Sequence, residues 1–307
     1  MRHPTLLRLI AAACLLAALP VQAQQLFRAY LASDGSDANP CTVQQPCRLL
    51  PAALAAVKDG GEVWMLDSAN FNTGLVNIAK SVSILAVPGA LGSVVGNAGD
   101  AINITAPGVR VALRNLKILN FNAGQNGILM TNGTSLKVEG CEIAGFTGAS
   151  GIKIATPAVV TIVDTVVRDN YNGILFDNGS RGDVARTTVV GNQYIGIWAG
   201  PTVASSPVSV MVTDSVSSNN AYGFVASAST SNQARMTVFR STAAHNSAVA
   251  FEAYGSSASM TVSASVAASN ATGFGNYEGA TFRSLVDNTV VDNAADVQGT
   301  ITTTAPR

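Results

Sequence analysis

The strongest constraint on the fold of this chain is an internal repeat of about 23 residues, which fills the sequence from about residue 60 onward. Residues 162–176 share one pattern of apolar and polar positions with residues 212–226 and 262–276. One apolar position recurs through eight units as Ile128, Ile152, Ile174, Ile197, Phe224, Phe251, Phe274 and Val297. Repeats of this length each form one structural unit, and neighbouring units stack to bury a shared core.

Apolar residues within each unit alternate along short runs, which is the spacing of β-strands that bury one face. There is no helical period, and leucine is too sparse for a leucine-rich repeat. A β-sandwich would not keep one register over eight units. The sequence therefore predicts an all-β parallel solenoid of about 9–10 rungs, counting one or two weaker rungs between Val63 and Ile104.

One turn position carries polar side chains in most units, and we expect these side chains to form a ladder of stacked, hydrogen-bonded amides. Our alignment assigns that column to Phe121, Phe146, Asn170, Gln193, Asn220, Ser247, Asn270 and Asn293. Cys141 falls in a neighbouring inward column with Leu116 and Thr165. It is therefore expected to be a buried, inert thiol rather than a nucleophile.

The amino terminus has the layout of a secretory signal peptide. Basic residues flank a short apolar run at residues 9–19, and Val21 and Ala23 are small residues placed for cleavage. We predict a secreted or periplasmic protein after cleavage near Ala23, with no membrane span, since no stretch of about 20 apolar residues occurs. An oxidising compartment would favour a disulfide between Cys41 and Cys47 in a Pro-bounded loop.

Charge excludes some partners. The chain has 18 basic and 18 acidic residues, and charged residues make up only 12% of it. We therefore predict no nucleic-acid partner, because bulk positive charge is absent. We also predict no resident metal or cofactor, since His245 is the single histidine after the signal peptide.

The segment at residues 28–40, with its Gly-Ser-Asp turn, resembles the opening of secreted right-handed parallel β-helix proteins of the pectin-lyase-like superfamily. The likeness continues through residues 46–50 and 60–63 and through the Asn-rich turns, and covers most of residues 26–300. It implies a right-handed β-helix with a short N-terminal helical cap at residues 49–57. The expected organisation is a signal peptide (1–23), a cap with strand, disulfide loop and helix (24–60), the β-helix (61–300) and a C-terminal tail (301–307).

The superfamily resemblance also implies a range of activities, because its members include polysaccharide lyases, glycoside hydrolases, esterases and epimerases. Their catalytic groups are usually outward-facing carboxylates with Arg, Lys or Ca²⁺. Seven charged residues crowd positions 164–186 of this chain. The candidate catalytic residues are Asp164, Arg168, Asp169, Arg186 and Asp214, and Ca²⁺ enters only under this lyase alternative. The longer signatures of polygalacturonases, pectin methylesterases and alginate epimerases are absent, and a solvated turn with exposed ion pairs is the simpler interpretation.

Two outward columns are unexpectedly apolar for a solvent-facing sheet. One contains Leu129, Lys153, Leu175, Trp198, Val225 and Glu252, and the other Val166, Val189, Val216, Ala243 and Val266. Such stripes indicate either a contact surface or a face covered by loops. The candidate binding residues are Trp198, Tyr194, Tyr171, Leu175 and Val225, and homo-oligomers could form through the stripes.

We therefore predict an exported β-helix protein that contacts an extracellular or envelope polysaccharide without catalysis. Whether the protein is an enzyme is left open by the sequence. The first alternative is a polysaccharide lyase or related carbohydrate-active enzyme using the surface from Asp164 to Arg186. The second alternative is a structural or adhesive assembly protein.

Overall fold

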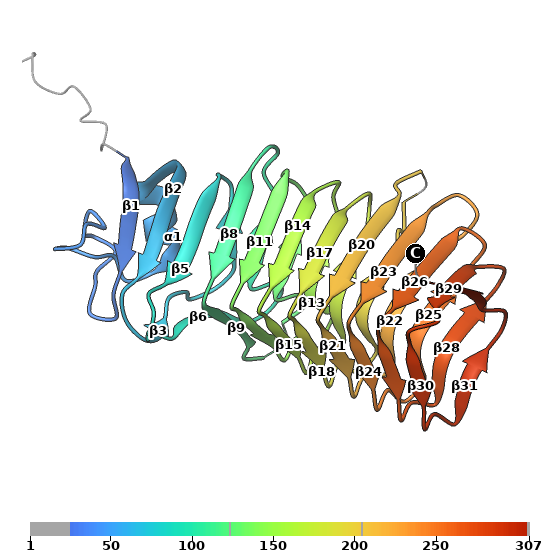
Figure 1. Cartoon of the computed structure of the whole chain (residues 1–307). Helices are drawn as coiled ribbons and strands as arrows, with labels where there is room; N and C mark the ends of the chain where they lie inside the picture. Colours follow the sequence, from blue (N-terminus) through green and yellow to red (C-terminus); the bar gives the residue numbers. More distant parts are fainter. Residues whose placement is uncertain (1–24, 123, 204, 306–307) are drawn as a thin grey trace, which may run out of the picture.

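The computed structural model describes residues 25–122, 124–203 and 205–305. The chain winds into a parallel β-solenoid of about ten turns, and three long sheets run along its axis (Figure 1). The signal peptide predicted at residues 1–23 lies outside the described residues. Among the described residues, no helix is long and apolar enough to cross a membrane.

Each full turn of the solenoid contributes one strand to each sheet, and sheet A has one additional strand at either end. Sheet A contains, in spatial order, β1 (Leu26–Leu31), β2 (Val57–Met65), β5 (Val82–Ala86), β8 (Arg110–Arg114), β11 (Ser135–Glu139), β14 (Val159–Val163), β17 (Arg181–Ala185), β20 (Val208–Thr213), β23 (Ala234–Phe239), β26 (Ala258–Ser263), β29 (Thr281–Leu285) and β32 (Thr302–Thr304).

Sheet B contains β3 (Ala69–Asn70), β6 (Gly92–Gly96), β9 (Leu116–Asn120), β12 (Glu142–Ala144), β15 (Val166–Arg168), β18 (Thr188–Val190), β21 (Val216–Ser218), β24 (Thr242–Ala244), β27 (Val266–Ala268) and β30 (Thr289–Val291). Sheet C contains β4 (Val76–Ile78), β7 (Ile102–Ile104), β10 (Ile128–Met130), β13 (Ser150–Ile154), β16 (Asn172–Phe176), β19 (Ile195–Ala199), β22 (Tyr222–Ser227), β25 (Val249–Tyr254), β28 (Thr272–Tyr277) and β31 (Ala295–Gln298).

Like positions meet between neighbouring turns, as the repeat predicts. In sheet C, Ile174 pairs with Ile197, and Ile197 pairs with Phe224. All three side chains are fully buried, so they form one wall of the core. Farther along the same column the rings of Phe224 and Phe251 stack with centroids 5.0 Å apart. The predicted solenoid and the interior column through these residues are confirmed.

The corner between sheets A and B is a sharp bend made around one left-handed residue per turn. Asp164, Arg186, Asp214 and Arg240 hold this position with φ between 46° and 51°. Asp adopts this conformation more readily than most residues, because its short polar side chain can bond locally. The bend turns the chain within one residue, and it fixes where these four charged side chains project.

An amide ladder follows the corner between sheets B and C. Each amide from Asn170 to Asn270 donates to the side-chain oxygen of the next, through Asn192, Asn220 and Asn246, with N–O distances of 2.9–3.4 Å. The ladder predicted from the sequence is present, but two of its members were assigned wrongly. Asn192 and Asn246 occupy the places that we gave to Gln193 and Ser247. Our assignment of Phe121 to the same inward column as Phe146 is also wrong, because Phe146 is buried whereas Phe121 is 80% exposed.

The two misassigned turns share one cause. After Asn192 and after Asn246, the chain takes one extra residue before it enters sheet C. Our alignment placed that extra residue earlier in the repeat, and it therefore shifted the assigned positions within β18 and β24 by one residue. A one-residue shift in a strand exchanges its inner and outer faces.

At the N-terminal end of the solenoid, α1 (Leu50–Ala56) packs against β1, β2 and β4 and buries Leu50, Ala53 and Leu54. The loop before it contains the disulfide between Cys41 and Cys47, as the sequence predicted. At the other end, residues 302–304 form β32, which pairs with β29. Residues 302–304 of the predicted C-terminal tail (301–307) therefore form a strand, which pairs along the open edge of sheet A.

Candidate functional site

The apolar stripe predicted on sheet C is a true column. Its members pair in the expected order, from Leu129 and Lys153 through Leu175 and Trp198 to Val225 and Glu252. They project outward, yet Leu175 is only 6% exposed and Val225 only 2%. Neighbouring outer side chains therefore cover much of this stripe.

The valine stripe predicted on sheet B is wrong. Val189 and Ala243 are fully buried and point into the core. The outer column of sheet B alternates instead, with Thr188 and Thr242 between the valines at 166, 216 and 266. This follows from the one-residue shift of β18 and β24, and it removes the continuous apolar surface that we had associated with subunit contact.

Two sets of tyrosines border the outer face of sheet C. At the turns that lead into the sheet, the Tyr171 and Tyr194 rings stack with centroids 5.8 Å apart, and Tyr222 meets Tyr194 edge-on at 5.3 Å. At the far ends of β25 and β28, Tyr254 pairs with Tyr277 in the sheet register. The floor between these two borders is the column that contains Trp198, Val225 and Glu252.

Together these residues form a groove of about 480 Å³. Its lining consists of Tyr194, Ile195, Trp198, Tyr222, Val225, Ser227, Val249, Glu252, Tyr254 and Tyr277. Its size lies within the range of small-ligand sites, which are lined mainly by apolar and aromatic side chains with a few polar groups.

Glycines allow the aromatic rings to lie close to the backbone. A Cβ at Gly200 would lie 2.2 Å from Nε1 of Trp198, and a Cβ at Gly275 would lie 2.6 Å from a ring carbon of Tyr277. The Trp198 indole donates a hydrogen bond of 2.7 Å to the Ser227 hydroxyl, which fixes its orientation. The Tyr277 hydroxyl lies 2.6 Å from the side-chain oxygen of Gln298 and donates to it.

Glu252 is the one charged group in this lining. Burial raises its pKa to about 7, because desolvation disfavours the carboxylate. Within the described parts of the chain, no ion pair or hydrogen bond reaches its side chain. Burial, together with the nearby Glu252 carboxylate, also raises the pKa values of Tyr222 and Tyr277.

The candidate catalytic residues form a different arrangement from the one expected. At the corner between sheets A and B, Arg186 binds Asp164 through two hydrogen bonds of 2.7 and 3.0 Å. Arg240 binds Asp214 in the same way, at 2.7 and 2.8 Å. These hydrogen bonds lower the pKa values of both aspartates. Arg186 stands between the two aspartates, so the column is a ladder of alternating charge.

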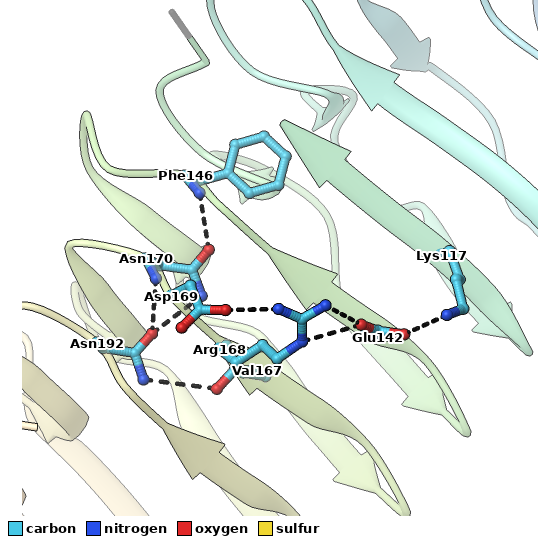
Figure 2. Close-up of polar contacts among 8 residues, drawn as sticks. All are labelled: Lys117, Glu142, Phe146, Val167, Arg168, Asp169, Asn170 and Asn192. Carbon is cyan, nitrogen blue, oxygen red and sulfur yellow. Dashed lines mark hydrogen bonds and ion pairs between the residues drawn. The ribbon is translucent and has the colours of Figure 1, made fainter. Parts of the chain in front are cut away.

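Arg168 and Asp169 lie at the other end of β15, where they belong to a second charged network (Figure 2). Arg168 contacts both Asp169 and Glu142, and Lys117 lies 2.6 Å from the other oxygen of Glu142. The Lys117 and Arg168 hydrogen bonds lower the pKa of Glu142.

The strand β15 therefore separates the five candidate catalytic residues into two groups, each already occupied by its own ion pairs. Across the described ranges, no three acidic, histidine or cysteine side chains are grouped so that they could hold a metal ion. Cys141 is a free, buried thiol, as expected, and burial raises its pKa to about 11.

The groove contains three of the five predicted binding residues, namely Trp198, Tyr194 and Val225. Tyr171 stacks on Tyr194 just outside the lining, and Leu175 pairs with Trp198 one turn below. Sequence reasoning did not single out the tyrosines at 222, 254 and 277 as site residues, nor Glu252. The spacing of Tyr254 and Tyr277, at equal distance after Phe251 and Phe274, was a usable signal for two of them.

A second hollow, of about 590 Å³, lies over sheet A and differs in its chemistry. Arg181 and Arg235 line it, and both pair with Ser209 between them in the register of the sheet. Its lining includes no carboxylate. The hollow on sheet A is lined by positive charge and the groove on sheet C by the acidic Glu252, so substitutions of these arginines can serve as controls for the groove.

A family model described as "Right handed beta helix region" matches residues 100–267, which is more than half of the chain. No curated protein matches the sequence. Among solved structures, a complex of XylC with xylose aligns with 90% of this chain and 70% of that chain, at a TM-score of 0.64 and 8% identity.

The pectate lyase Pel9A aligns with 91% of this chain and 77% of its own, at a TM-score of 0.52 and 14% identity. The GH136 lacto-N-biosidase from Eubacterium ramulus aligns with 91% of this chain and 68% of its own, at a TM-score of 0.51 and 10% identity. At these identities the likeness concerns the fold. The right-handed parallel β-helix predicted from the sequence is confirmed.

Proposed function

Because this chain belongs to the right-handed β-helix family, we propose that it is an exported protein that binds a polysaccharide in the groove on the outer face of sheet C, without catalysing a reaction on it. The observation that carries this proposal is the bordered aromatic groove around Trp198. Three proteins of similar fold are named for pectate, xylose and a lacto-N-biose activity, which agrees with a sugar ligand.

The groove offers the two kinds of contact that a sugar needs. The faces of a pyranose ring are apolar and can stack on Trp198 and the tyrosine rings, while its hydroxyls need hydrogen-bond partners. The hydroxyls of Tyr222 and Tyr254 and the Ser227 side chain supply polar groups around those rings. A polymer could lie along the row of turns, since equivalent positions recur from one strand of sheet C to the next.

The groove favours binding over hydrolysis. Most glycoside hydrolases use two carboxyl groups that flank the scissile bond. Glu252 is the single carboxyl group that lines this groove, so a second one is not at hand. We therefore propose that Glu252 acts in recognition.

The lyase alternative uses the surface from Asp164 to Arg186. A lyase base must be free to take a proton, but Arg186 lowers the pKa of Asp164 and occupies both of its oxygens. The arrangement supports a structural ladder more than a catalytic set. The disulfide between Cys41 and Cys47 favours an oxidising compartment, which agrees with export.

The test is affinity electrophoresis of the protein, from residue 24 onward, through gels that contain different polysaccharides. We expect at least one polymer to retard the wild-type protein, and Trp198→Ala and Tyr254→Ala to abolish that retardation. Tyr254 is 48% exposed, so its removal should leave the fold intact, which circular dichroism would check. Arg235→Ala, on sheet A, is the matched control and should bind as the wild type does.

Equal mobility of all four proteins in every gel would refute the proposal. The lyase alternative is tested with uronate polymers, with and without Ca²⁺, by following the ultraviolet absorbance of unsaturated products. We expect no increase in absorbance. Steady product formation that Asp164→Asn abolishes would establish the alternative instead.

A further inference from the structure

Glu252 occupies an unusual place for a carboxyl group. It projects from the middle of β25 onto the groove floor, with Val225 on one side in the sheet register and Gly275 on the other. Neither neighbour can donate a side-chain hydrogen bond. The ring of Tyr277 lies over Gly275, and it lines the same groove as the carboxyl group.

The groups that face Glu252 across the groove are aromatic hydroxyls and rings. The titratable residues of the lining are Tyr194, Tyr222, Tyr254 and Tyr277, and the lining includes no Lys, Arg or His. A buried carboxylate without a partner is costly, and an opposite charge brought to it restores the lost stabilisation. The lining thus offers the Glu252 carboxylate no positively charged partner, and a ligand with a positive charge could supply one.

The rings strengthen this preference. The face of an aromatic ring carries negative potential, and a cation within about 6 Å of its centroid is attracted to it. Trp198 and the four tyrosines surround the space next to Glu252. A uronate or sulfate group would add a second negative charge there, whereas a hard metal ion would need about six to eight oxygen ligands.

We propose that the groove on sheet C recognises a sugar that carries a protonated amine, which pairs with Glu252 while the aromatic rings enclose it. The proposal rests on the polysaccharide-binding function proposed above and names its ligand class as unacetylated amino sugars. The protonated amine supplies the positively charged partner that Glu252 lacks, and the sugar rings stack on the Trp198 ring as described above.

The test compares two oligosaccharides with the same backbone, β-1,4-linked glucosamine and its fully N-acetylated form, by isothermal titration calorimetry at pH 6.5. We expect the wild-type protein to bind the free amine about tenfold or more tightly, since a charge-assisted hydrogen bond contributes about 1.5–3 kcal/mol. Glu252→Gln should bring the two affinities within about twofold of each other. Arg235→Ala should preserve the wild-type preference.

Competition with choline, whose positive charge does not change with pH, provides a second readout. Its affinity for the wild-type groove should rise between pH 5 and pH 9 as Glu252 ionises, and its affinity for Glu252→Gln should stay constant. If the N-acetylated oligomer binds as tightly as the free amine, the amine preference is refuted while the sugar-binding function stands. If neither oligomer binds and no polysaccharide retards the protein, both proposals fail.

Discussion

Replacing Glu252 by Gln should stabilise the folded protein at alkaline pH and leave its stability nearly unchanged near pH 4. The reason is the pKa of Glu252, which burial raises from 4.5 to about 7. The folded protein favours the protonated form, so the wild type has its full stability below about pH 4.5. It loses part of that stability as the pH rises toward 7, above which the loss is constant. Glutamine is neutral throughout and avoids this loss.

The size of the effect follows from the shift. One pKa unit corresponds to about 1.36 kcal/mol, so the wild type should lose up to roughly 3 kcal/mol between pH 4.5 and pH 8. In chains of 150–250 residues, about 1 kcal/mol moves the melting temperature by roughly 2–4 °C. We therefore expect the variant to melt up to roughly 6–12 °C above the wild type at pH 8.5, and close to it at pH 4.5.

Thermal unfolding followed by circular dichroism at pH 3.0, 4.5, 6.0, 7.0 and 8.5 measures this difference, and the lowest pH covers the control described next. Glu142→Gln serves as a control of opposite sign. The Lys117 and Arg168 contacts lower the pKa of Glu142, so its contribution to stability is present at neutral pH and disappears as the pH falls through that lowered pKa. If the melting temperatures of the wild type and Glu252→Gln differ by the same amount from pH 4.5 to pH 8.5, the groove does not contain an unpartnered, desolvated carboxyl group.

Three further predictions concern the parts of the solenoid outside the groove. Asn220→Leu removes the acceptor of the Asn192 backbone N–H and leaves it buried, so we expect a stability loss of about 3 kcal/mol or more in urea unfolding; an unchanged midpoint would show that the amide ladder is dispensable. Cys141 should not react with a thiol reagent at pH 8 until the protein unfolds, because burial raises its pKa to about 11, and rapid labelling of the folded protein would contradict its inward position. Asp164→Asn removes the charge that pairs with Arg186 and keeps a residue type that tolerates the left-handed backbone, so it should leave the melting temperature and polysaccharide retardation unchanged, whereas lost retardation would give the charged corner a role in binding.

The repeat made the fold predictable because stacking turns the sequence period directly into spatial neighbours. The column through Ile174 and Ile197 was assigned correctly, since its side chains are large, apolar and fully buried. The outer face of sheet B was harder. Valine occurs on both faces of β18, so the pattern itself did not show that Val189 points inward and Thr188 outward.

The amide ladder contained the information that would have set this register. Asparagine is available in every turn from Asn170 to Asn293, and Asn192 and Asn246 stand directly before the residues that we chose. Requiring one side-chain type throughout the ladder would have put the extra residue of these turns after the asparagine. The strands β18 and β24 would then have had their correct faces.

The groove was predictable only in part. Trp198 and Val225 were found because they share a column, which depends on sequence period alone. Tyr222 and Tyr277 reach the groove from different strands, and their convergence depends on side-chain direction at turns of unequal length. The burial of Glu252 likewise depends on the rings around it, so its raised pKa had no signature in the sequence.

The central claim, that a sugar binds beside Trp198, can be tested by tryptophan fluorescence because the chain has only two tryptophans. Trp64 lies in β2, near the N-terminal cap, so Trp64→Phe leaves Trp198 as the single emitter. Titrating this variant with the polysaccharide that retards the wild type should change the Trp198 emission with saturation, at the affinity that calorimetry gives for the same polysaccharide. The Trp198→Phe variant, which keeps Trp64, should show no change. Heat of binding without any change in Trp198 emission, or a saturable change from Trp64 alone, would place the sugar elsewhere and contradict the claim.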